Sequence, residues 1–109
     1  MSFSSFSKTE ISTLFKKASM RVRSGGLKIL TAPASGVYAR MLMVASAKTG
    51  TAPERNLFKR RLRALFREGE FYEKGIDFII IADKSGVNLS FESLKELFYK
   101  AFDRHNSAA

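Results

Sequence analysis

Residues 55–67 read "RNLFKRRLRALFR" and contain six arginines and lysines but no acidic residue. On a helical wheel, four large apolar side chains fall on one side, which is the pattern of a helix packed against a core. These side chains are Phe58, Leu62, Leu65 and Phe66. Beside them runs a polar ridge about 16 Å long with the spacing i, i+4, i+7, i+11. The ridge consists of Asn56, Arg60, Arg63 and Arg67, while Arg61 falls outside it and is expected to be a solvated flank.

The segments on either side of this helix indicate a sheet. Pro53 suits the first helical turn and Gly69 suits the end of the helix. Downstream, "GIDFIIIA" (75–82) is a solid apolar run, which is typical of a strand covered on both faces. Upstream, "VYARMLMVAS" (37–46) alternates and predicts another strand. Its inward face would hold Val37, Ala39, Met41, Met43 and Ala45, and the face that carries Tyr38 is the candidate ligand groove.

The two ends of the chain complete an α+β fold. Ile11, Leu14, Phe15 and Ala18 have helical spacing, and Ser7 or Thr9 is placed to cap that helix. "SMRVRS" and "LKILTA" flank a Gly-Gly break and predict two short strands, and a last helix follows Ser90. We expect one small domain over residues 1–109, with helix, two or three strands, helix, strand and helix, and with the helices packed on one mixed sheet. Residues 1–6 and 105–109 are expected to fray.

Charge placement indicates a polyanionic partner. The net charge is +9, and the first 67 residues carry fourteen basic and two acidic side chains. Such a concentrated positive field favours nucleic acid, because bound cations release condensed counterions. A membrane-surface helix shows similar amphipathicity, but this helix is short and its apolar face is needed by the neighbouring strands. The chain has no cysteine, no apolar run long enough to span a membrane and no signal-peptide pattern, so a cytoplasmic protein is expected.

Protein-based nuclease chemistry is not expected. The single histidine, His105, lies in the tail that we expect to fray, where nothing would hold a general base in position. The ten acidic residues form no convincing group beside the basic ridge, whereas a two-metal site needs several converging carboxylates. We therefore expect neither a catalytic residue nor a metal site in the protein.

The segment "SAKTGTAPERNLFKRRLRALFR" (46–67) resembles the signature of the bacterial ribonuclease P protein component. The match is gapless, and the order of the flanking segments "EISTLF", "GIDFIIIA" and "LSFESLKELF" also resembles that family. The matching residues are Ser46, Lys48, Gly50, Arg55, Asn56, Lys59, Arg60 and Arg63. The sequence departs from the signature at Ala47, Thr51 and Leu57.

The resemblance implies a left-handed βαβ crossover around the basic helix and a role in removing the 5′ leader of precursor tRNA. It implies that the catalytic RNA subunit and its bound Mg²⁺ perform the chemistry, in a complex of one protein and one RNA. The matching residues, together with Arg67, would contact RNA. A cleft between the first helix and the sheet would hold the leader, and the residues expected there are Ile11, Phe15, Leu30 and Tyr38. The alternative is a non-catalytic module that binds structured RNA, as a ribosomal protein does.

Overall fold

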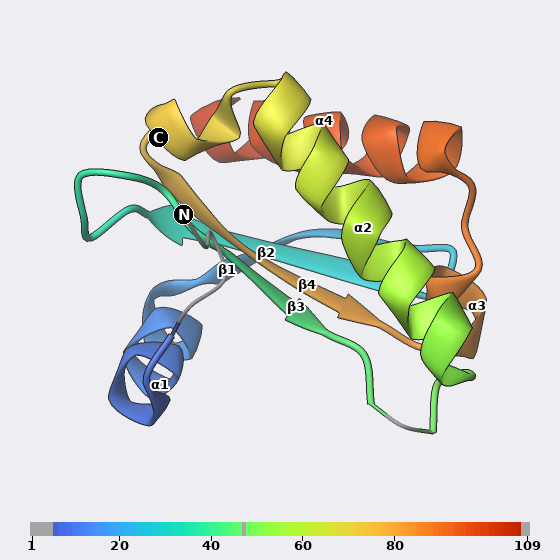
Figure 1. The fold of residues 1–109 in the computed structure, drawn as a ribbon. Helices are drawn as coiled ribbons and strands as arrows, with labels where there is room; N and C mark the ends of the chain where they lie inside the picture. The colour runs from blue at the N-terminus through green and yellow to red at the C-terminus, as the bar shows by residue number, and fades with distance from the viewer. Residues whose placement is uncertain (1–5, 47, 108–109) are drawn as a thin grey trace.

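The computed structural model describes residues 6–46 and 48–107, and its helices and strands follow the predicted order (Figure 1). The elements are α1 Lys8–Lys17, β1 Ser19–Ser24, β2 Leu27–Pro33, β3 Met41–Val44, α2 Ala52–Glu68, the 3₁₀ turn η1 Phe71–Glu73, β4 Ile76–Ala82, α3 Lys84–Val87 and α4 Phe91–Ser107. The α+β prediction is confirmed. A four-residue helix, α3, also lies between β4 and α4, where no helix or strand was predicted.

The four strands form one mixed sheet in the order β1-β2-β4-β3. β2 pairs antiparallel with both β1 and β4, while β3 pairs parallel with β4, and α2 connects these two parallel strands. In Figure 1, β3 lies in front of β4 and α2 lies above both, so the chain turns counter-clockwise as it recedes from the viewer. This is the left-handed crossover that the resemblance implied, although most βαβ units are right-handed.

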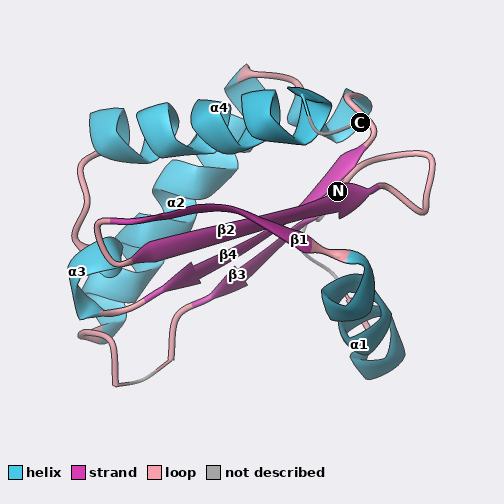
Figure 2. Ribbon diagram, turned by 180° about the vertical axis from the view of Figure 1, so that it is seen from behind, coloured by secondary structure: helices cyan, strands magenta, loops and turns pink. Residues whose placement is uncertain are grey.

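Helices cover both faces of the sheet. α2 and α4 lie on one face and α1 lies on the other (Figures 1 and 2). The larger core lies under α2 and α4 and is rich in aromatic rings; Phe98 packs 4.7 Å from Phe71 and 4.3 Å from Phe78 between ring centroids. A smaller apolar cluster under α1 is built on Leu14, Ala32 and Ile79. The central strand β4 is buried on both faces, as its solid apolar run predicted.

The strand predicted over residues 37–46 is shorter than expected. Only Met41–Val44 forms β3, and Val37 is 92% exposed rather than inward-facing. The backbone before β3 is held by other partners, because the Ala39 N–H donates to the Tyr72 carbonyl and the Arg40 N–H donates to the buried carboxylate of Asp77. The rest of the predicted inward face does pack against the larger core.

The carboxyl-terminal helix is longer than expected. Residues 105–107, which were expected to fray, form the end of α4. His105 Nδ1 lies 2.7 Å from the hydroxyl oxygen of Thr31, which ties this end of α4 to β2. Of the other residues expected to fray, Phe6 packs against the apolar cluster under α1, and residues 1–5 and 108–109 lie outside the described part of the chain.

Candidate nucleic-acid interface

The basic helix α2 begins and ends at defined residues. The Thr51 hydroxyl accepts a hydrogen bond from the Glu54 N–H, and the Glu54 carboxylate accepts one from the Thr51 N–H, which makes a capping box. These contacts, the backbone N–H of Thr51 first, lower the pKa of Glu54. Pro53 lies in the first turn and Gly69 is the carboxyl-terminal cap. The four predicted apolar side chains, Phe58, Leu62, Leu65 and Phe66, are all buried.

The polar ridge of α2 faces solvent. All four of its members, Asn56, Arg60, Arg63 and Arg67, are exposed, and Arg55 and Lys59 lie half-buried beside them. Among residues 6–46 and 48–107, an ion pair joins Arg40 to Glu10, and it lies far from this ridge. The ridge therefore presents positive charge that no acidic side chain of the described residues neutralises, which is the electrostatic requirement for binding a polyanion.

Arg61 and Arg55 differ from the other arginines of α2. Arg61, which was expected to be a solvated flank, is half-buried and its guanidinium donates to the Leu89 carbonyl at 2.7 Å. Arg55 Nε is buried and has no hydrogen-bond partner among the described residues. An unpaired buried donor is unfavourable. Its burial also separates this nitrogen from the exposed surface of the ridge.

The loop before α2 carries three of the predicted residues. Its turn is closed by Thr49, whose N–H and hydroxyl both donate to the Ser46 carbonyl, at 3.0 and 2.6 Å. Ser46 and Lys48 are exposed. A Cβ on Gly50 would lie 3.3 Å from Glu54 Oε1, so a small residue here leaves room for the capping box. The nine predicted RNA-binding residues thus lie on one loop and the helix that follows it, and Ala47 lies outside the described residues.

The predicted cleft residues are only partly brought together. Ile11 and Phe15 lie about one helical turn apart on α1; Ile11 is half-buried and Phe15 is 40% exposed. Leu30 packs in the cluster beneath α1. Tyr38 is not on a strand, and its ring instead lies 6.4 Å from the ring of Tyr72, which packs against the core on the α2 and α4 side. The expectation that Tyr38 lies on a strand face that lines the predicted cleft is therefore wrong.

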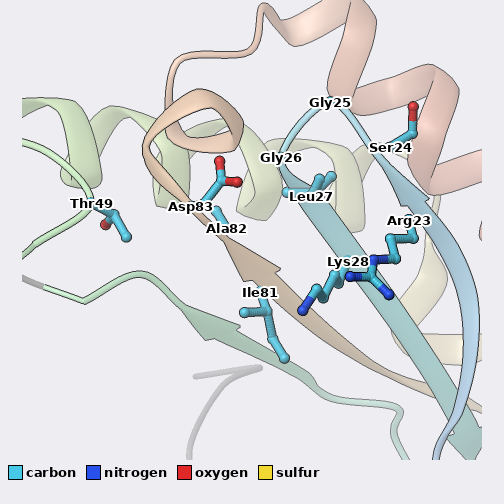
Figure 3. Close-up of a pocket in the computed structure, with 10 residues that line it drawn as sticks. All are labelled: Arg23, Ser24, Gly25, Gly26, Leu27, Lys28, Thr49, Ile81, Ala82 and Asp83. Atoms are coloured by element: carbon cyan, nitrogen blue, oxygen red, sulfur yellow. The ribbon is translucent and has the colours of Figure 1, made fainter.

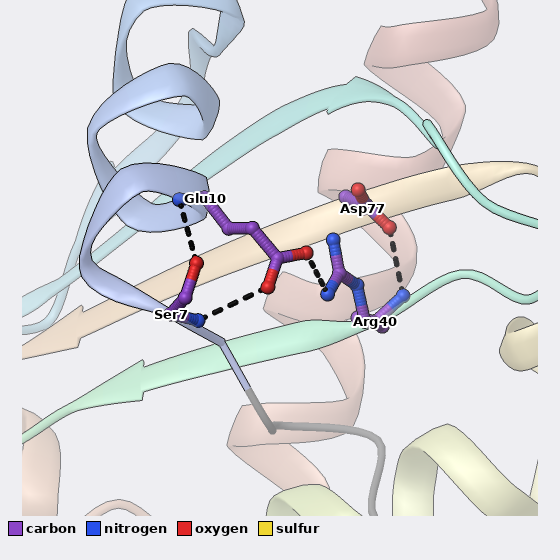
Figure 4. Close-up of polar contacts among 4 residues, drawn as sticks. All are labelled: Ser7, Glu10, Arg40 and Asp77. Carbon is purple, nitrogen blue, oxygen red and sulfur yellow. Dashed lines mark hydrogen bonds and ion pairs between the residues drawn. The ribbon is translucent and has the colours of Figure 1, made fainter.

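A polar network anchors α1 against the sheet (Figure 4). The Ser7 N–H donates to Glu10, and the Arg40 guanidinium lies 2.5 Å from the other oxygen of that carboxylate. These contacts, Ser7 first, lower the pKa of Glu10. Arg40 also donates its backbone N–H to Asp77 at 2.7 Å, yet burial outweighs this bond and raises the pKa of Asp77. A small pocket of about 130 Å³ lies beside this network, between α1 and the sheet.

A larger pocket, of about 560 Å³, opens at the opposite end of the sheet (Figure 3). It is lined by the β1–β2 hairpin, the end of β4 and Thr49 from the loop before α2. Its two basic residues, Arg23 and Lys28, were not singled out from the sequence. The signal was present, because a two-residue Gly-Gly turn aligns the residues that flank it.

The described residues contain no group of three or more His, Cys, Asp or Glu side chains that could hold a metal ion. None of the described helices is long and apolar enough to cross a membrane.

Comparison with known proteins agrees with this geometry. The model of the family described as Ribonuclease P matches residues 6–106. The ribonuclease P protein component of Photobacterium profundum is 39% identical over 85 residues, which cover 77% of this chain and 72% of that protein. The counterpart from Phytoplasma australiense is 29% identical over 102 residues, covering 90% and 86% of the two chains.

A solved structure of the Staphylococcus aureus RNase P protein shares the fold, with a TM-score of 0.76 at 18% identity and 94% coverage of both chains. The fold and the family match over nearly the whole described chain lead to one conclusion: the chain belongs to the ribonuclease P protein family.

Proposed function

We propose that this chain is the protein subunit of ribonuclease P and that the loop 46–50 and the ridge of α2 bind the catalytic RNA subunit. The observation that carries the proposal is the exposed, uncompensated ridge of Asn56, Arg60, Arg63 and Arg67 in a chain of this family. Arginine guanidinium groups suit phosphate oxygens because they donate two parallel hydrogen bonds. Arg55 and Lys59, half-buried beside the ridge, add positive charge to the same surface.

The groove between α1 and the sheet is the proposed site for the 5′ leader of precursor tRNA. Phe15 is exposed enough to stack on a base, and Ile11 and Leu30 provide apolar surface nearby. The reaction is endonucleolytic removal of the leader, which yields the mature 5′ end. The RNA subunit and its Mg²⁺ supply the chemistry, while the protein binds and orients both RNAs. The working complex is one protein and one RNA in the cytoplasm.

The decisive experiment is cleavage of precursor tRNA at low Mg²⁺ by the ribonuclease P RNA of the same source, with and without the protein. We expect cleavage at the mature 5′ end only when the protein is present. Salt-sensitive RNA binding with no gain in cleavage, using correctly folded RNA, would instead indicate a non-catalytic module that binds structured RNA.

The ridge itself is tested by the double variant Arg60→Gln/Arg63→Gln. The removal of two arginines that bind phosphates should make the dependence of log affinity on log salt less steep by about 1.8 for duplex-like RNA. Binding of the catalytic RNA subunit is measured by titration at several salt concentrations. The matched control is Lys95→Gln/Lys100→Gln, which removes two charges from exposed positions of α4. Equal slopes for the wild type and the ridge variant would contradict this assignment.

A further inference from the structure

The pocket at the hairpin end of the sheet lies on a continuous row of side chains that crosses all four strands. Register pairs Arg23 of β1 with Lys28 of β2, Lys28 with Ile81 of β4, and Ile81 with Val44 of β3. We call these four residues the open row. At about 4.8 Å between strands, it is about 14 Å long. It has two cations at one end and two apolar side chains at the other.

The open row borders the surface that α1 covers. The next row along the same face consists of Met20, Leu30, Ile79 and Leu42, and Leu14 of α1 packs in a cluster with the last three. The two rows are two residues apart along β2, about 7 Å. Of the open row, Ile81 is half-buried and packs against the same cluster, whereas Arg23 and Lys28 are exposed and Val44 is 37% exposed.

The two cations of the open row lack an acidic partner among the described residues that line the pocket. Like charges directly opposite each other on neighbouring strands destabilise the pairing, so a bound anion would relieve this pair. Asp83 is the one acidic residue of that lining, but its carboxylate accepts hydrogen bonds from the Ser85 and Gly86 N–H groups, at 2.8 and 3.0 Å. In Figure 3 the Arg23 and Lys28 side chains lie beside each other, and the Asp83 carboxylate points away from them.

The hairpin that carries both cations is held in place. Gly26 accepts a hydrogen bond on its carbonyl from the Asp83 N–H at 2.9 Å, and a Cβ on Gly26 would lie 2.1 Å from Asp83 Oδ1. The hairpin backbone therefore sits directly against the start of α3. This contact fixes the backbone from which Arg23 and Lys28 extend, so the two side chains start from neighbouring, defined positions.

We propose that the open row binds a nucleotide of single-stranded RNA, with a phosphate between Arg23 and Lys28 and the base against Ile81 and Val44. Two adjacent cations suit a phosphodiester, and apolar side chains can pack against the face of a base without selecting its identity. This inference rests on the proposed function, because the RNA would be the part of the leader that continues beyond Phe15 and Leu30.

The test compares the assembled RNA–protein complex on precursor tRNA with a long leader and on mature tRNA without one. Wild-type complex should bind the long-leader substrate more tightly. In the variant Arg23→Gln/Lys28→Gln, the affinity for the long-leader substrate should fall by on the order of tenfold. Its salt dependence should be less steep by about 0.7 for each single-strand phosphate that the variant no longer neutralises. Lys95→Gln/Lys100→Gln is again the charge-matched control.

The base contact is tested separately by Val44→Ser, which should weaken binding of the long-leader substrate without changing the salt slope. Three outcomes would overturn the inference: no effect of the Arg23/Lys28 variant, an equal loss on mature tRNA, or a loss confined to assembly with the RNA subunit. If the wild-type complex shows no preference for the leader, the proposed leader-binding function fails instead. Circular dichroism of each variant confirms that it is folded.

Discussion

Two neighbouring arginines of α2 show how one residue type takes two roles. Arg60 and Arg61 are one step apart on a helix, so their side chains point in directions about 100° apart. Arg60 is exposed on the ridge, whereas Arg61 turns toward the segment between α3 and α4 and donates to the Leu89 carbonyl. Arg60 is therefore available to RNA, while Arg61 holds α2 to the rest of the fold.

Exchanging these arginines one at a time should separate stability from RNA binding. Arg61→Gln should lower the free energy of unfolding by about 1 kcal/mol, since it removes a charged hydrogen bond, and should leave the salt slope of RNA binding unchanged. Arg60→Gln should leave stability within about 0.5 kcal/mol and flatten the slope. Urea denaturation and RNA titration measure the two quantities. A flatter slope for Arg61→Gln would show that this guanidinium also contacts RNA.

At the scale of elements, the turn of the β1–β2 hairpin depends on its two glycines. Its turn residues Gly25 and Gly26 have φ of 61° and 81°, which is the geometry of a two-residue turn that favours glycine. Gly26 also leaves no room for a Cβ, because Asp83 Oδ1 and the Gly86 N–H would lie 2.1 and 2.7 Å away. At Gly26, steric overlap and the positive φ therefore both disfavour any residue with a Cβ.

Gly26→Ala and Gly75→Ala form a matched pair that isolates this steric cost. Gly75 has a similar φ of 72°, but nothing lies within 4 Å of the position that a Cβ would take there. Gly75→Ala should lower the free energy of unfolding by about 1 kcal/mol from backbone strain alone. Gly26→Ala should lower it by roughly 1–3 kcal/mol more, through the overlap with Asp83 and Gly86. If thermal or urea unfolding gives equal losses of unfolding free energy for the two variants, α3 shifts at little cost to accommodate the added methyl group.

Elements whose pattern lies within one segment were predicted well. The buried stripe and exposed ridge of α2 both follow from helical spacing, and the apolar run of β4 indicated its central place. The shortening of β3 could not be foreseen, because its backbone partners, Tyr72 and Asp77, lie more than thirty residues further along the chain. Similarly, the open row needs the register of three strand pairs, of which the sequence indicates only the hairpin.

At the scale of the whole molecule, the two proposed RNA surfaces lie on opposite sides of one sheet. The ridge belongs to α2 on one face, and the groove and open row belong to the face that α1 partly covers (Figure 2). The segment between β3 and α2 joins them, since it carries Ser46 and Lys48 and also contributes Thr49 to the pocket. Under these proposals, the domain would hold the catalytic RNA subunit and the leader on opposite faces of the sheet.

The contact between His105 of α4 and Thr31 of β2, which closes the carboxyl-terminal helix onto the sheet, should make the free energy of unfolding depend on pH. Arg21 Nε donates to the Thr31 hydroxyl at 2.9 Å, and the hydrogen of that hydroxyl is then free to be donated to His105 Nδ1, a hydrogen bond that only a neutral ring can accept. Burial first, and then the charge of Arg21, lower the pKa of His105 below its usual 6.5. The unfolded chain therefore binds the proton more readily, so the free energy of unfolding should fall as pH drops from about 6.5 through the folded-state pKa.

The variant His105→Gln keeps an acceptor for Thr31 and should flatten the stability profile in that pH window. The loss of stability below about pH 4.5, where Glu10 and Glu54 lose their low-pKa stabilisation, should persist in this variant. Urea denaturation at successive pH values measures both parts of the profile, and a profile unchanged by His105→Gln would show that protonation of this histidine does not disturb the closing contact.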